Sequence, residues 1–201
     1  MLAAMSTNPR SDKRELILAK GAQVMLRRGY HGTGVQEIVQ AASIPKGSFY
    51  HYFASKEDFA LQALEYLYLP RLERYAQALA NPALSPRERI LGYYRELLAH
   101  FARPEKLQFH CFIGSLSFEM AELSPAIGNQ VGAILQRSAQ ILQGCLEQAR
   151  AAGELPANED CENLAAFIAN AWQGVLTQLK VGSRGEPIQS FIVRLERLLQ
   201  A

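Results

Sequence analysis

Three cysteines give this chain of 201 residues its clearest potential for covalent chemistry: Cys111, Cys145 and Cys161. Their odd number and wide spacing argue against a disulfide framework and against a zinc site of the CxxC type. We therefore expect reduced thiols, and neither a metal nor another cofactor. A thiol is a good nucleophile when a nearby positive charge favours its thiolate, whereas burial alone favours the protonated form.

The three thiols have different surroundings in the sequence. Cys111 lies in the segment KLQFHCFIGSLSFEMAEL, a nearly apolar run expected to be helical, in which a buried inert thiol is the usual outcome. Cys145 shares an apolar helical stripe with Leu142 and Ala149, which predicts core packing. Cys161 falls in the first turn of another expected helix, but acidic neighbours on both sides oppose the effect of the helix dipole.

A second group of residues has types and spacing suited to binding a polyanion. The segment 33–53 reads as two short helices joined by a tight connection at Ser43 and Ile44, with Pro45 as the first residue of the second helix. Such a pair is typical of a helix-turn-helix, whose second helix enters the major groove of DNA. We expect these residues to contact DNA: Thr33, Gly34, Lys46, Gly47, Ser48, Tyr50, His51 and Lys56.

The chemistry of these residues supports that expectation. Lys46 can donate to guanine or to a phosphate, Gly47 permits close backbone approach, and the polar side chains that follow can donate to phosphates. Backbone amides near Thr33 and Gly34, at a helix N-terminus, can take a phosphate oxygen, and Lys56 is placed for another. The alternative is a plain helical hairpin whose aromatic residues only pack. The joint spacing of the group favours DNA binding.

The distribution of charge agrees with a small DNA-binding head. Residues 10–56 carry eight Lys or Arg against three Asp or Glu, which is a net charge of +5, while the rest of the chain is at −3. A solvated charged surface would explain the same asymmetry. The excess lies in the segment that holds the predicted helix-turn-helix.

The elements that position both groups are expected to be helices. Apolar residues recur every three or four positions, no segment alternates at period two, and proline or glycine separates the runs. We predict an all-α chain of about nine helices, with a helix-turn-helix domain at 1–54, in which residues 1–9 are disordered, and a larger domain at 55–201. No run of eighteen apolar residues and no signal peptide is found, which predicts a cytoplasmic protein without membrane contact.

Residues 17–59, ILAKGAQVMLRRGYHGTGVQEIVQAASIPKGSFYHYFASKEDF, resemble the N-terminal signature of the TetR repressor family. The sequence departs from the pattern at Gly21, where Ala is usual, and at Pro45, where Ser or Thr is common. The resemblance implies a transcriptional repressor, not an enzyme, that binds a palindromic double-stranded DNA operator as a homodimer and is released by a small-molecule effector.

The resemblance also implies roles for the last two helices. They are expected to form a four-helix bundle across the dimer axis, with an interface made by Leu164, Ile168, Val175, Phe191 and Leu195. A polar stripe on the penultimate helix lines an effector pocket or faces solvent, and we assign the pocket to Phe112, Trp172, Gln173 and Thr177.

The pattern C-F-I-G-x-L-x-x-E at Cys111, followed by ELSPAIG, resembles a subgroup of the family that responds to reactive electrophiles through a cysteine. Members of that subgroup commonly carry a lysine at the end of the penultimate helix, as Lys180 is here, and its ammonium would favour the thiolate. We therefore predict Cys111 and Lys180 as the sensor. Induction by a reversible ligand is the alternative, and a cysteine-dependent enzyme is a remote one, because the chain has no recognisable catalytic motif.

Overall fold

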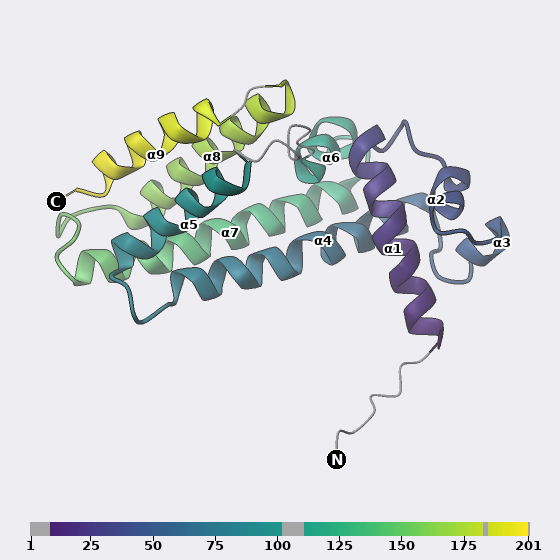
Figure 1. The fold of residues 1–201 in the computed structure, drawn as a ribbon, viewed down its shortest axis with the longest axis horizontal. Helices are drawn as coiled ribbons and strands as arrows, with labels where there is room; N and C mark the ends of the chain where they lie inside the picture. The colour runs from purple at the N-terminus through teal and green to yellow at the C-terminus, as the bar shows by residue number, and fades with distance from the viewer. Residues whose placement is uncertain (1–8, 102–110, 183–184, 201) are drawn as a thin grey trace, which may run out of the picture. The chain divides into compact units, whose positions relative to one another are not determined.

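The computed structural model describes residues 9–101, 111–182 and 185–200, with backbone alone for residues 9–11. Within these ranges the structure has nine α-helices and no strand, which confirms the predicted all-α class (Figure 1). The disorder predicted for residues 1–9 falls almost wholly outside the described residues, and Pro9 already begins the first helix. The helices are α1 Pro9–Arg28, α2 Val35–Ala41, α3 Lys46–Phe49, α4 Lys56–Leu79, α5 Pro86–Phe101, α6 Phe112–Met120, α7 Pro125–Ala151, α8 Cys161–Lys180 and α9 Glu186–Leu198.

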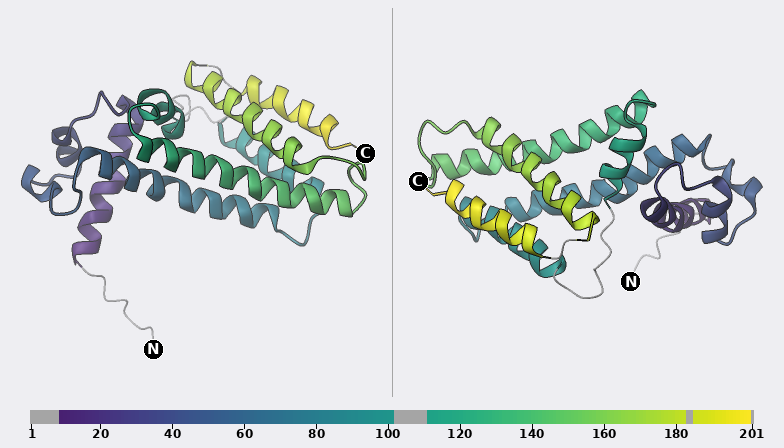
Figure 2. Two further views of the ribbon diagram at one scale, coloured as in Figure 1. Left: turned by 180° about the vertical axis from the view of Figure 1, so that it is seen from behind. Right: turned by 90° about the horizontal axis from the view of Figure 1, so that it is seen from above.

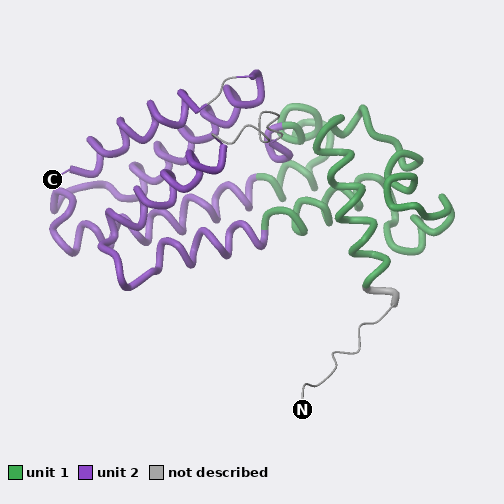
Figure 3. The backbone as a smooth tube through the Cα atoms, viewed as in Figure 1, with its two compact units in different colours: residues 1–68, 115–131 green, residues 69–114, 132–201 purple. Residues whose placement is uncertain are grey.

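The chain forms two compact units (Figure 3). Unit 1 comprises residues 1–68 and 115–131, and unit 2 comprises residues 69–114 and 132–201. The helices α4, α6 and α7 each contribute residues to both units. The functional boundary between residues 54 and 55 is a different kind of division and stays a prediction.

Unit 1 has a core of aromatic side chains from α3, the turns after it and α4. Phe49, Phe53 and Phe59 are buried, and their ring centroids lie 5.1 to 5.8 Å apart. Aliphatic side chains of α1 and α2 complete this core, namely Ile17, Leu18, Met25, Ile38 and Val39. Burying one face of each short helix in this way fixes which residues of α3 face outward.

Unit 2 has a larger core in which α9 packs against α5 and α8, as the views of Figure 2 also show. Tyr94 lies at its centre, with its ring centroid 5.2 Å from that of Trp172 and 4.9 Å from that of Phe191. Burial raises the pKa of Tyr94 and of Tyr75 well above the ordinary value for tyrosine. Both hydroxyls are therefore neutral packing groups at physiological pH.

Gly21 allows α1 to approach its neighbours unusually closely. A Cβ atom at this position would lie 2.6 Å from Cγ2 of Ile38 and 2.7 Å from Cζ of Phe59. Both side chains are fully buried, so moving either of them disturbs the packed core around it. The departure from the family pattern at this position therefore has a steric reason.

We expect Gly21→Ala to destabilise the protein although alanine is the better helix former. Overpacking of a filled core costs about 1–3 kcal/mol, which exceeds the roughly 1 kcal/mol gained in helix propensity. Gly132→Ala in α7 is the matched control, because an added Cβ there meets no atom within 4 Å and should stabilise the protein. Urea unfolding of both variants gives the comparison, and equal stabilisation by the two substitutions would contradict this account.

Candidate functional site

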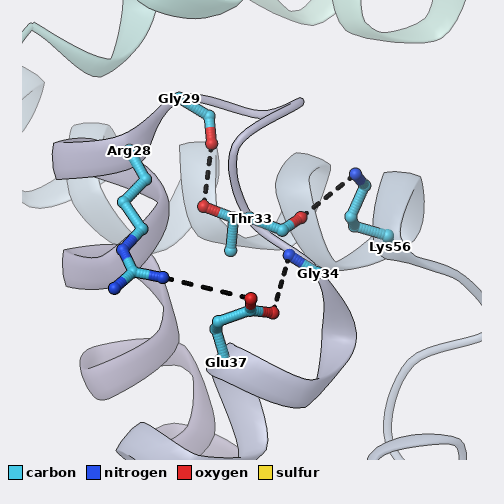
Figure 4. Close-up of polar contacts among 6 residues, drawn as sticks. All are labelled: Arg28, Gly29, Thr33, Gly34, Glu37 and Lys56. Carbon is cyan, nitrogen blue, oxygen red and sulfur yellow. Dashed lines mark hydrogen bonds and ion pairs between the residues drawn. The ribbon is translucent and has the colours of Figure 1, made fainter.

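The turn between α1 and α2 is held by its own side chains. Gly29 ends α1 with φ of 78°, a conformation that glycine adopts without strain, and its amide donates to the carbonyl of Met25 at 2.9 Å. The hydroxyl of Thr33, which is completely buried, donates to the carbonyl of Gly29 at 2.8 Å (Figure 4). The Thr33 hydroxyl therefore closes the turn and is committed inside the protein.

Gly34 is the N-cap residue of α2, and its amide is also committed. It donates to Oε2 of Glu37 at 3.0 Å, while Oε1 of the same carboxylate lies 4.0 Å from a guanidinium nitrogen of Arg28 (Figure 4). Glu37 thus satisfies an amide at the start of α2 that has no partner within the helix.

Lys56, the first residue of α4, points back onto the same turn. Its Nζ donates to the carbonyl of Thr33 at 3.1 Å (Figure 4). It also donates to the carbonyl of Tyr30 at 3.1 Å and lies 4.1 Å from the centroid of the Tyr30 ring. From the sequence we expected this ammonium to contact a DNA phosphate. In the structure it braces the turn, as Thr33 and Gly34 do.

The other predicted DNA contacts lie on or directly after α3 and form an outward face. The side chains of Lys46, Tyr50 and His51 are exposed, Ser48 is half-buried, and an added Cβ at Gly47 would meet no atom within 4 Å. Phe49 lies on the opposite side in the core. The structure therefore brings these five residues together.

The local structure around α3 differs slightly from the prediction. Pro45 is the N-cap residue and not the first helical residue, and α3 ends at Phe49, with turns over residues 50–52. The connection before it passes through Ser43, which has φ of 54°. At the start of α4, the Asp58 amide donates to Ser55 Oγ at 3.0 Å, so Ser55 caps this helix.

The three thiols are buried and free, but their hydrogen bonds run in opposite directions. Cys111 directly precedes α6, so the predicted helix over 106–122 begins later than expected, and residues 106–110 lie outside the described ranges. The Gly114 amide donates to Sγ of Cys111 at 3.3 Å. Cys111 therefore occupies the capping position of α6 with its sulfur as the acceptor.

The other two thiols donate. Sγ of Cys145 donates to the carbonyl of Pro86 at 3.4 Å, and Sγ of Cys161 donates to the carbonyl of Glu159 at 3.8 Å. Burial raises the pKa of Cys145 to about 11, an effect that nearby Arg89 only partly opposes. Burial also raises the pKa of Cys161. Both thiols keep their proton near neutral pH.

The residues assigned to the sensor and its pocket lie at different depths. Phe112 is buried, Trp172 and Gln173 are half-buried, and Thr177 is exposed with its hydroxyl donating to the carbonyl of Gln173 at 3.0 Å. Cys111 and Lys180 both belong to unit 2, with Lys180 as the exposed last residue of α8. Their pairing and the pocket stay predictions.

Four of the five residues assigned to a dimer interface are core residues of the single chain. Leu164, Ile168, Val175 and Leu195 are buried within unit 2, and Phe191 is half-buried against Tyr94 and Trp172. Their apolar stripe holds α8 and α9 against the chain itself. Their assignment to a dimer interface stays a prediction.

Glu119 contributes to the braced turn and was not anticipated as part of it. Its Oε2 accepts a hydrogen bond from the His31 amide at 3.0 Å. The two residues are 88 positions apart in the sequence, and no spacing signal connects them.

Among the described residues, no group of three or more His, Cys, Asp or Glu could hold a metal ion, and no helix is long and apolar enough to span a membrane.

Comparison with known proteins places these features in one family. Residues 17–63 match the bacterial regulatory proteins of the tetR family, and residues 86–195 match the tetracyclin repressor-like C-terminal domain. The chain is 31% identical over 192 residues to the HTH-type transcriptional repressor DhaR of Mycobacterium sp. (strain GP1), covering 94% of each chain. It is 30% identical over 195 residues to the HTH-type transcriptional repressor NemR of Escherichia coli (strain K12), covering 97% of this chain and 98% of NemR.

Solved structures agree with the sequence relatives. The reduced form of E. coli NemR matches with a TM-score of 0.86 at 31% identity, covering 94% of this chain and 97% of that one. A cysteine mutant of the regulator CifR, complexed with 26bp double-strand operator DNA, matches with a TM-score of 0.79 at 26% identity, covering 92% and 95% of the two chains. On the match to both family models and to full-length relatives, the chain belongs to the TetR family of bacterial regulatory proteins.

Proposed function

We propose that this protein is a cytoplasmic transcriptional repressor that binds a palindromic operator as a homodimer and is released by a small-molecule or electrophilic effector. The observation that carries the proposal is the outward face at α3, where Lys46, Tyr50 and His51 are exposed above a buried Phe49. Donors of this kind on the second helix of a helix-turn-helix contact bases and phosphates in the major groove. The complex of the related CifR with operator DNA supports the same role.

The DNA-contacting set falls into two groups with different tasks. Lys46, Gly47, Ser48, Tyr50 and His51 form the contact surface, whereas Thr33, Gly34 and Lys56 hold the turn that orients it. Lys56 already makes two hydrogen bonds to backbone carbonyls, so a phosphate would receive only its remaining N–H.

Dimerisation would use the outward faces of α8 and α9. Phe167 is 52% exposed on α8 and Val193 is 47% exposed on α9, and both are large apolar side chains on helices whose other faces are buried. A two-fold axis through these faces would pair each helix with its copy and set two α3 faces on successive turns of DNA.

Cys111 is the sensor that the hydrogen bonds favour. Sγ of Cys111 already accepts an amide hydrogen bond that an attacking sulfur can keep, whereas Cys145 and Cys161 would lose a hydrogen bond on losing their proton. Lys180 is the cation that we assign to the same sensor. The relatives are transcriptional regulators, and we assign no catalytic activity to this chain.

Replacing Tyr50 by alanine should lower operator affinity at least tenfold without unfolding the protein. A contact at a base or phosphate is worth about 1–3 kcal/mol, and the dimer loses it twice. Tyr66→Ala in α4 is the matched control, because Tyr66 is a partly exposed tyrosine away from α3. Titration with operator DNA gives the affinity of each variant. Equal affinities of the two variants would contradict the proposal that α3 contacts the operator.

Lys56→Met should lower both operator affinity and stability. Loss of two hydrogen bonds from an ammonium would reduce the free energy of unfolding by about 1.5–3 kcal/mol, and the turn would no longer orient α3. Lys46→Met removes an exposed ammonium, so it should change affinity alone. A Lys56→Met protein as stable as the wild type would show that the ammonium is a DNA contact only.

N-Ethylmaleimide should release the wild-type protein from its operator through Cys111. The thiolate adds to the maleimide C=C bond, an S–C bond forms, and the displaced electron pair becomes an enolate that water protonates. Burial raises the pKa of Cys145 to about 11, so little of it is thiolate near pH 7.5 and its labelling should be slow. Intact-protein mass spectrometry and operator binding, measured in parallel, follow the reaction.

Cys111→Ser is the test variant, since serine is a good helix cap and preserves the start of α6. It should bind the operator and resist release, whereas Cys145→Ser and Cys161→Ser should behave as the wild type. Equal release of Cys111→Ser and wild type would reject the cysteine sensor and favour a reversible ligand.

A further inference from the structure

The last turn of α6 lies against the turn between α1 and α2. The His31 amide donates to Oε2 of Glu119 at 3.0 Å. The other carboxylate oxygen, Oε1, would lie 2.4 Å from a Cβ atom at Gly29, so only glycine leaves room for the carboxylate. The hydrogen bond and the close approach show that the Glu119 carboxylate contacts the backbone of the turn at residues 29–34, which we call the braced turn.

A second contact holds the corner after α6 to the start of α4. The Ser124 hydroxyl, which is buried, donates to Oε1 of Glu57 in the first turn of α4 and accepts from the Ile127 amide at 3.2 Å. Glu119 and Ser124 flank the α6–α7 corner, and all of these residues belong to unit 1. We call residues 35–53, from α2 to the turns after α3, the recognition segment. The corner is therefore held to the two elements that flank this segment, namely the turn before α2 and the first turn of α4.

We propose that Glu119 is a positioning residue for DNA reading, through which α6 holds the α1–α2 turn in its operator-binding arrangement. The proposal rests on the proposed function. The turn that Glu119 contacts is the one that Thr33, Gly34 and Lys56 brace, and it leads directly into α2, which packs on α3. A displacement of Glu119 thus acts on the orientation of α3 without touching DNA.

The same helix begins at the proposed sensor. The helix α6 has nine residues, and a helix this short has little stability alone, so its position depends on its contacts with the rest of the chain. At one end the Cys111 sulfur accepts from the Gly114 amide, and at the other Glu119 accepts from the His31 amide. The structure with free thiols has both hydrogen bonds, and we assign it to the operator-binding form.

Alkylation would disturb the first of these contacts. The new S–C bond places a bulky group on a sulfur whose residue is only 7% exposed, and we expect α6 to shift to make room. A shift along this short helix withdraws the Glu119 carboxylate from His31. The turn then loses one of its supports, and α3 loses the orientation that fits the major groove.

Hydrogen exchange at the His31 amide tests this directly, because it needs no operator. In the wild-type protein, complete alkylation of Cys111 by N-ethylmaleimide should accelerate exchange of this amide at least tenfold, while Cys111→Ser under the same treatment should show no change. Full alkylation with His31 protection intact would overturn the proposal.

Glu119→Ala provides the second test, with Glu122→Ala as the matched control, since Glu122 is an exposed carboxylate in the turn that follows α6. We expect Glu119→Ala to speed His31 exchange at least tenfold, to weaken operator binding about tenfold, and to reduce the further effect of N-ethylmaleimide. Glu122→Ala should match the wild type in all three. Wild-type exchange and affinity in Glu119→Ala would reject the role of Glu119.

The two proposals fail in distinguishable ways. If the wild-type protein does not bind an operator or is not released by N-ethylmaleimide, the proposed function is wrong, whatever His31 does. If the wild type is released normally and Glu119→Ala behaves as Glu122→Ala does, the proposed function stands and the positioning role is wrong.

Discussion

The recognition segment depends on one short turn whose backbone groups are satisfied by side chains. A turn between two helices cannot pair its carbonyls and amides within either helix, and leaving them unpaired would cost free energy. Here Thr33, Glu37, Lys56 and Glu119 supply the missing partners from α1–α2, α2, α4 and α6. The orientation of α3 follows from this turn, because α2 begins at its end and packs on α3.

The direction of a hydrogen bond separates three thiols that burial alone does not. All three are buried, so exposure gives no reason to prefer any of them. Cys145 and Cys161 each donate a hydrogen bond to a backbone carbonyl, whereas Cys111 accepts a hydrogen bond from a backbone amide. That difference follows from position in the fold, since only Cys111 stands immediately before a helix with its sulfur turned toward the helix amides.

The sequence predicted the helices and the outward face of α3 because both depend on local patterns. Apolar periodicity defines helices, and Phe49 with Phe53 defines which side of the recognition segment is buried. What each apolar helix face packs against was harder to predict. An apolar stripe on α8 and α9 does not say whether it meets the same chain or a second copy, and Leu164 and Ile168 turned out to be core residues.

The partners of polar residues near the recognition segment were equally hard to predict. Lys56 has the right charge for a phosphate, but two carbonyls of the turn lie within its reach. Glu119 could not be found from spacing, since its partner is 88 residues away. The start of α6 was misplaced because its apolar composition continues through Cys111, and composition does not reveal a capping sulfur.

The close approach at Gly21 also limits how this recognition domain can be exchanged with those of its relatives. Helix α1 is set so near Ile38 and Phe59 that the three positions form a single steric unit. A chimera that brings in alanine at position 21 from another family member would need smaller side chains at 38 or 59 as well. In such a chimera the exposed residues of α3 can be replaced one at a time, whereas positions 21, 38 and 59 beneath them have to be transferred as a set.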